Sequence, residues 1–351
     1  MSEPLVEVVR GPLVEAVHRG DVAVVDSSGV LRASVGDPES KVSYLRSSAK
    51  PFQSMPLVYG GAAARWTFDD EDLAVCCASH NGEPVHTHRI ASLLERIGVA
   101  PADLACGAHP PLHRDAAAAL ARDGVEPNVL HSNCSGLHTG MLAQARQLGV
   151  DIRGYESPGH PVQQEVLANV ARFTGLTPGD IPVGVDGCAA PCYGVSLYHM
   201  AFAYARLVDP RDVGEPYASA AGAIRTAMTR HPHLVAGTGR FDTDVMTLGK
   251  GLVLAKGGAS GVQCVGITGG VGVAVKIEDG AEGHASPARP TTVAAIEVLR
   301  QLGVLDDTQV AVLGEHARPV MRTVPGEPVG EVRPAFTLAP GPVTTRPDVT
   351  A

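Results

Sequence analysis

The fold is restricted most strongly by where strand-type sequence occurs: it lies at both ends of the chain, around a helical middle. Alternation and β-branched residues predict strands at 13–18, 21–26, 30–35, 252–255, 262–268 and 271–277. Helical periodicity predicts helices at 52–59, 70–78, 84–97, 114–122, 136–148, 160–173, 194–207, 216–230 and 291–302. The simplest arrangement is one antiparallel sheet built from both chain ends and flanked by helices, an α/β (α+β) fold.

The chain gives no sign of a linker or an internal repeat. We therefore predict a single catalytic domain over residues 1–340, followed by a Pro-rich tail at 341–351. One further segment, 331–338, is predicted as an edge strand just before that tail.

Charge and hydropathy exclude several classes of protein. Hydrophobic residues make up 44% and charged residues 19% of the 351 positions, far from the composition of disordered chains. A net charge of −9 argues against nucleic acid as a partner. Because no apolar run is long enough to span a membrane and the start does not look like a signal peptide, we expect a cytoplasmic protein without membrane contact.

Lysine is rare in this chain, with five among 351 residues, so each lysine is a candidate for a chemical role. Ser47-x-x-Lys50 falls at a predicted helix start, where Pro51 fits the first turn and the two side chains face the same way. A lysine desolvated near a second cation can lose its proton and serve as the base for a serine hydroxyl. The alternative is a capping serine beside a surface lysine.

Cysteine occurs seven times, an odd number that favours free thiols or metal ligands over disulfides. Cys134 and Cys188 each precede a predicted helix, which suits a reactive thiol, a metal or an anionic group, although buried small cysteines are equally compatible. Ser79-His80-Asn81-Gly82 ends another helix, either as a cap or as part of a site.

Other motifs are less specific. The pairs His86-x-His88 and His231-x-His233 resemble metal pairs, but side chains two residues apart diverge on a helix, so surface histidines are the preferred interpretation. Gly269-Gly270-x-Gly272 precedes a strand and is interpreted as a strand turn, not a dinucleotide loop.

Five motifs in order give the chain a family resemblance. They are RSSAKP at 46–51, CASH at 77–80, NCSGLH at 133–138, DGC at 186–188 and KGGASG at 256–261. The set resembles the class 3, rhizobial-type L-asparaginases, over about residues 8 to 335. That family is similar in fold to the serine β-lactamases and serine-dependent glutaminases, which agrees with the sheet predicted above.

The resemblance implies two Ser-Lys tandems, Ser47 with Lys50 and Ser79 with Lys256. It also implies a zinc ion held by Cys134, Cys188 and a lysine at position 137, where this chain has Leu137. Because two thiolates leave zinc short of its usual four ligands, we expect little zinc, unless His138 or Cys192 replaces the lysine. No organic cofactor is expected.

The implied reaction is hydrolysis of L-asparagine to L-aspartate and ammonia through an acyl-enzyme on Ser47. From their charge and position, Arg46, His138, Asp186 and Arg240 are candidates for binding the substrate. We also expect a homodimer. Two alternatives stay open: another amidase, acting on glutamine, β-lactams or peptides, or a non-enzymatic thiol- or metal-binding relative.

Overall fold

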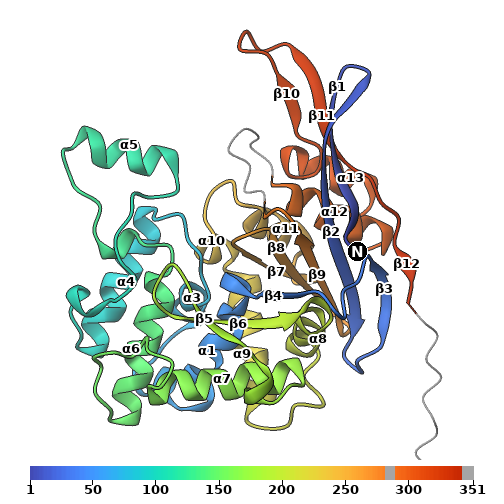
Figure 1. Ribbon diagram of the computed structural model, residues 1–351. Coiled ribbons are helices and arrows are strands. Elements are labelled where there is room, and N and C mark those ends of the chain that lie inside the picture. The colour runs from blue at the N-terminus through green and yellow to red at the C-terminus, as the bar shows by residue number, and fades with distance from the viewer. Residues whose placement is uncertain (281–288, 342–351) are drawn as a thin grey trace, which may run out of the picture.

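The two ends of the chain lie side by side in one large sheet. The computed structural model describes residues 1–280 and 289–341. In Figure 1 the blue N-terminal strands and the red C-terminal strands are neighbours, and most of the helices lie beside them. The antiparallel sheet flanked by helices is confirmed. Residues 342–351 of the predicted tail lie outside the described part of the chain.

Within residues 1–280 and 289–341, the strands form a nine-stranded sheet and a small three-stranded sheet. The large sheet contains β1 (Glu3–Arg10), β2 (Leu13–Asp26), β3 (Leu31–Val35), β7 (Val253–Gly258), β8 (Val262–Ile267), β9 (Val271–Ile277), β10 (Val320–Arg322), β11 (Pro328–Pro334) and β12 (Ala339–Pro340). The small sheet contains β4 (Val42–Tyr44), β5 (Val183–Val185) and β6 (Pro191–Ser196).

The order in the large sheet is β10-β11-β1-β2-β9-β8-β7, with β3 pairing with both β2 and β12. Antiparallel β1 and β11 place Val8 opposite Val332, and β2 and β9 place Val24 opposite Val273. Two predictions need correction. The separate strands 13–18 and 21–26 are one strand, and β1, which pairs with it, was not predicted. The segment predicted as an edge strand at 331–338 is shifted: β11 lies between β1 and β10, so β10 forms the edge.

Helices fill the middle of the chain much as the periodicity predicts. They are α1 (Lys50–Tyr59), α2 (Ala62–Arg65), α3 (Asp70–Cys76), α4 (Pro84–Ile97), α5 (Arg114–Arg122), α6 (Ser135–Leu148), α7 (Pro161–Thr174), α8 (Leu197–Val208), α9 (Tyr217–Arg230), α10 (Pro232–Val235), α11 (Phe241–Gly249), α12 (Pro290–Gln301) and α13 (Asp307–Val312). The predicted helix 194–207 starts late, because its first residues end strand β6. Ser196 caps α8 by accepting a hydrogen bond from the His199 backbone N–H.

The start of α1 is fixed by both local and tertiary structure. A short 3-10 turn, η1 (Arg46–Ala49), precedes the helix, and Pro51 occupies its first turn as predicted. Phe52 packs against Tyr204, with ring centroids 5.5 Å apart. The Tyr204 hydroxyl donates a hydrogen bond to the Ser48 carbonyl, at 2.8 Å. The turn that carries Ser47 is therefore tied to the core.

Helix α8 packs closely on the large sheet at glycine positions. A Cβ atom on Gly272 would lie 1.8 Å from the Ala201 carbonyl oxygen, so only glycine permits this approach. Gly269 and Gly270 adopt positive φ angles of 105° and 90° in the connection between β8 and β9. The glycine-rich motif is therefore a strand turn, as predicted.

Two clusters of buried hydrophobic side chains support these layers. One joins the large sheet to α8, α9 and α12, and the other surrounds α4 and α6. The division into one catalytic domain and a tail stays a prediction. Within the described residues, no helix is both long enough and apolar enough to cross a membrane.

Candidate active site

The centre of the candidate site is a serine hydroxyl held between two lysine amines. Ser79 Oγ lies 3.0 Å from Lys50 Nζ and 2.9 Å from Lys256 Nζ. Lys50 comes from the first turn of α1, Ser79 from the loop after α3, and Lys256 from strand β7. Both lysines are almost fully buried, with 2% and 1% of their surface exposed. We call these three residues the amine cluster.

Lys256 is held by its neighbours on β7 and α11. Its Nζ donates a hydrogen bond to the Gly257 carbonyl at 2.7 Å and lies 4.0 Å from the Asp242 carboxylate. Asp242 is itself buried and accepts hydrogen bonds from the Gly257 N–H and from Gln263 Nε2. Asp242 is not among the site residues predicted from the sequence. The one sequence feature that points to it is its place as an acidic residue in the first turn of a largely apolar helix.

Lys256 has a strongly altered pKa. The pKa of Lys256 is lowered to about 7: burial lowers it most, the carboxylate of Asp242 opposes this, and the charge of Lys50 adds to the lowering. Near neutral pH a substantial fraction of Lys256 is therefore the free amine. A free amine in contact with a serine hydroxyl is the arrangement needed for general-base catalysis.

Lys50 connects the amine cluster to a thiol pair. Its Nζ donates hydrogen bonds to the Ala78 carbonyl at 2.6 Å and to Cys134 Sγ at 3.1 Å. A hydrogen bond from the Cys188 thiol lowers the pKa of Cys134, and the Lys50 charge adds to this effect. The neighbouring thiol and the Lys50 amine thus both favour ionisation of the buried Cys134 thiol.

Ser47 lies on the open side of this arrangement. Together with Lys50, Arg46 and Asp186 it lines a small cavity of about 10 Å³. That volume is roughly enough for one water, so a larger ligand must displace part of the lining. Within the described residues, no hydrogen bond joins the Ser47 hydroxyl to the Lys50 amine, which instead contacts Ser79.

Arg46 and Asp186 pair with each other at this cavity. Arg46 Nε and Nη2 donate to the two carboxylate oxygens of Asp186 at 2.9 and 3.1 Å, and Nη1 donates to Ser260 Oγ at 2.9 Å. Burial alone would raise the pKa of Asp186, but the hydrogen bonds and charge of Arg46 produce a net lowering. The pair presents one cation and one anion side by side, the combination that an amino acid requires.

Comparison with known families identifies the family of this chain. The sequence profile described as L-asparaginase II matches residues 6–334. The chain belongs to this family. The amine cluster is compatible with membership in this family. A comparison with curated proteins finds no significant match.

Among solved structures, this L-asparaginase II family member is similar to Mglu. The structure of native Mglu in 4.3 M NaCl shares 17% identity at a TM-score of 0.36, covering 83% of this chain and 63% of that chain. The glutamate form of Mglu shares 18% identity at a TM-score of 0.34, covering 85% and 61%. The chain thus spans less than two thirds of the length of these Mglu chains.

The zinc site implied by the family resemblance does not fit the side chains of this family member. Leu137 is buried and lines the small cavity beside Cys188, so it supplies no ligand. Within the described residues, Cys134 and Cys188 belong to no group of three metal-ligating side chains, and Lys50 ammonium already contacts the Cys134 sulfur. We therefore derive no catalytic step through zinc.

The other two predicted substrate-binding residues lie further from the cavity. His138 is fully buried, and its Nδ1 is 2.6 Å from the Tyr155 hydroxyl. Arg240 Nη1 donates to Asn81 Oδ1 at 3.2 Å, two residues beyond Ser79. Neither side chain lines the cavity next to Ser47. Direct contact of these two residues with substrate stays a prediction.

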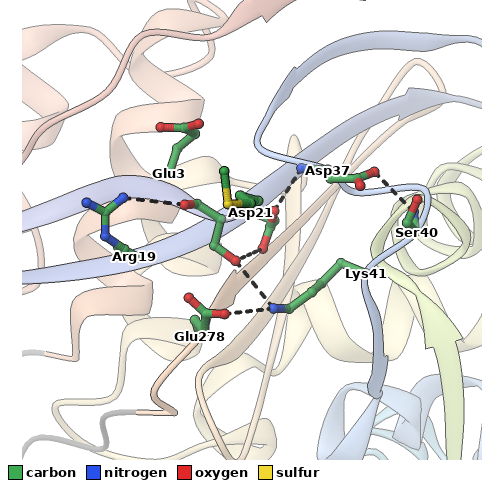
Figure 2. Close-up of a pocket in the computed structure, with 9 residues that line it drawn as sticks. Glu3, Arg19, Asp21, Asp37, Ser40, Lys41 and Glu278 are labelled. Carbon is green, nitrogen blue, oxygen red and sulfur yellow. Dashed lines mark hydrogen bonds and ion pairs between the residues drawn. The ribbon is translucent and has the colours of Figure 1, made fainter.

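A larger cavity of about 600 Å³ lies elsewhere and is shown in Figure 2. Several of its polar side chains pair with one another: Ser2 Oγ donates to Asp21, and Lys41 Nζ donates to Glu278 at 3.1 Å. The lining shares no residue with the amine cluster or with the cavity at Ser47. Size alone therefore does not identify the site of chemistry.

Proposed function

We propose that this protein is an amidohydrolase that converts L-asparagine to L-aspartate and ammonia, with Ser47 as the acylated nucleophile. The observation that carries the proposal is the Ser79 hydroxyl held between the buried amines of Lys50 and Lys256. Ser47 is assigned the attack because it lines the cavity beside Lys50, whereas Ser79 lies behind that lysine and is 5% exposed.

The amine cluster provides a path for the proton. Ser79 passes its hydroxyl proton to the free amine of Lys256, Lys50 passes one of its protons to Ser79, and the lone pair so freed on Lys50 accepts the hydroxyl proton of Ser47. The Ser47 oxygen then forms an ester bond with the amide carbon. The proton returns along the same path to the departing nitrogen, which leaves as ammonia, and water cleaves the ester to release aspartate. Lys50 must turn toward Ser47 during this step, and such contacts often tighten only when substrate is bound.

The Arg46–Asp186 pair is proposed to recognise the amino acid. The substrate α-carboxylate pairs with Arg46 and its α-ammonium with Asp186, so each side chain exchanges one counter-ion for another. Because the cavity has room for only about one water, breaking this pair is also how the substrate makes space.

Two other amidase substrates compete with asparagine. Glutamine carries the same α-groups on a longer side chain, whereas a β-lactam or peptide lacks the free α-ammonium that Asp186 would bind. The small cavity favours the shorter amino acid. The non-enzymatic alternative rests on Leu137, and the buried pair of lysines around Ser79 argues against it, because burying two amines is costly without a chemical use.

The experiment compares wild type, Ser47→Ala and Ser79→Ala by ammonia release from asparagine and glutamine, and by spectrophotometric ring opening of a β-lactam, which releases no ammonia. We expect asparagine to be the preferred substrate, no turnover by Ser47→Ala, and slow residual turnover by Ser79→Ala. Mass spectrometry should detect an acyl adduct on the peptide that contains Ser47. If Ser79→Ala abolishes activity while Ser47→Ala retains most of it, the nucleophile is Ser79. No hydrolysis of any of these amides would support the non-enzymatic alternative.

A further inference from the structure

A second polar group lies a few residues from Ser79. Glu83, at the N-terminus of α4, His86, in the first turn of α4, and His233, in α10, bring one ligand atom each to within 4.8 Å of one another. Glu83 Oε2 lies 4.0 Å from His86 Nδ1 and 3.7 Å from His233 Nε2. We call these three residues the imidazole cluster.

His86 has the hydrogen-bond pattern of a metal ligand. Its Nε2 lies 3.0 Å from the His233 carbonyl oxygen, which can only accept, so Nε2 carries the proton. Nδ1 is then an unprotonated lone pair, and it has no hydrogen-bond partner within the described residues. The side chain is 0% exposed. Metal-binding histidines typically donate their other ring N–H to a carbonyl or carboxylate in this way.

Glu83 is also held in place before any ligand binds. The Thr238 N–H donates to Oε2 at 3.0 Å, and the Thr238 hydroxyl donates to Oε1 at 2.6 Å. Ligand carboxylates in metal sites are commonly fixed by such bonds. The third ligand, His233, has a half-exposed side chain, which leaves a way in from solvent.

We propose that Glu83, His86 and His233 bind a divalent transition-metal ion of the Zn²⁺ class. Two imidazole nitrogens and one carboxylate oxygen suit such an ion, with water completing the coordination. Tetrahedral ligation at about 2.0–2.1 Å places neighbouring ligand atoms about 3.3 Å apart, so the distances of 3.7 and 4.0 Å need only a small contraction. The site is separate from the thiol pair and does not depend on the proposed hydrolysis.

An ion in this position would join the loop of Ser79 to a distant segment. The ring of His80 stacks on that of His86, with centroids 4.9 Å apart, and His80 directly follows Ser79. His233 and Thr238 belong to the segment that leads to Arg240. We therefore assign the ion a structural role: it holds the 79–86 segment against residues 233–240.

Cobalt(II) is the probe that tests the site, because its absorption spectrum distinguishes ligand types. Full-length protein is stripped with a chelator, titrated with Co²⁺ and then with competing Zn²⁺. We expect one equivalent of Co²⁺ to give visible d–d bands without thiolate-to-cobalt charge transfer. His233→Ala should weaken binding roughly 100-fold or more, since loss of even a second-shell partner costs 10- to 100-fold.

His88→Ala is the matched control, because His88 is an exposed histidine on the same helix. It should bind Co²⁺ like the wild type, and Zn²⁺ should raise the Tm of both but not of His233→Ala. Since His233 is half-exposed, its substitution should leave the fold intact, as checked by circular dichroism. The proposal is overturned if stripped wild type binds no more Co²⁺ than His233→Ala. It is also overturned if binding is lost in Cys134→Ser instead.

Discussion

The amine cluster and the imidazole cluster adjoin the same stretch of chain, yet they have opposite charge character. At one end of the 79–86 segment, two buried lysines surround a hydroxyl; at the other, a carboxylate lies between two imidazoles. Two neighbouring cations repel each other and favour loss of a proton, whereas a carboxylate with a neutral imidazole attracts a cation. Most side chains of both clusters are buried, so the arrangement of charge, not burial alone, decides what each can bind or transfer.

A buried lysine on the same sheet sharpens this contrast. Lys276 on β9 is also largely buried, and burial lowers the pKa of its amine. Its Nζ donates to the backbone carbonyls of Ser260 and Ile277 and contacts no serine hydroxyl within the described residues. Lys256, by contrast, meets Ser79. A lysine with a lowered pKa becomes a candidate base only where its amine can contact a proton donor next to a cavity.

The largest expected effect is loss of the proton acceptor. Lys256→Arg keeps the positive charge but cannot supply a free amine, so kcat should fall by about 10²–10⁴, as for loss of a general base. Steady-state ammonia release measures it, with the more exposed Lys41→Arg as the control. A near-native rate in Lys256→Arg would remove Lys256 from the proton path and leave the amine cluster without its proposed function.

A second variant tests whether the anion that lines the cavity at Ser47 binds substrate. Asp186→Asn removes the proposed counter-ion for the α-ammonium, so KM for asparagine should rise about tenfold, which corresponds to about 1.4 kcal/mol, with a smaller change in kcat. The exposed Asp180→Asn is the control. An unchanged KM would mean that Asp186 only positions Arg46.

The pH profile tests the charge balance within the amine cluster. Because activity requires the free amine of Lys256, whose pKa is lowered to about 7, kcat/KM should rise with pH through about 7. The carboxylate of Asp242 raises that pKa, so Asp242→Asn should move the rising limb to lower pH. A limb that stays in place, in a variant with wild-type circular dichroism, would contradict the assignment of the titration to Lys256.

The smallest expected effect is a gain of zinc at the thiol pair, Cys134 and Cys188. Leu137→Lys restores the amine that the family resemblance places with Cys134 and Cys188, and should add one equivalent of zinc to whatever the imidazole cluster holds. Elemental analysis after dialysis measures the gain against Leu137→Met. If wild type already holds zinc that Cys134→Ser removes, another side chain has taken the place of the lysine. The thiol pair beside the amine cluster would then bind a metal as the imidazole cluster is proposed to do.

Local sequence predicted most of the fold, because helix periodicity and strand alternation are properties of neighbouring residues. The helix at 84–97 and the strand at 271–277 agree with α4 and β9 to the residue. Strand β1 was missed, since its place depends on a partner at the far end of the chain. The pairing of Ser79 with Lys256 was predicted only through the family resemblance, and the turn of Lys50 from Ser47 toward Ser79 was not predicted.

The imidazole cluster shows the same limit. His86 and His233 each belong to a His-x-His pair, and the sequence favours surface histidines for both pairs. The proposed histidine ligands come one from each pair, not two from the same pair. Their contact spans 147 positions of sequence, so no local pattern could have revealed it. Asp242 likewise gains its importance only when β7 brings Lys256 beside it.

The sheet made from both chain ends also sets the order in which the protein can be completed during synthesis. Arg333 on β11 pairs with Glu7 on β1 at 3.0 Å, although they are 326 positions apart. While the ribosome is still making β11, the outer edge of β1 has no neighbour, and an unpaired edge can recruit a strand from another chain. Contacts of such long range also slow folding. The newly made chain therefore depends on its final strands to close an aggregation-prone edge.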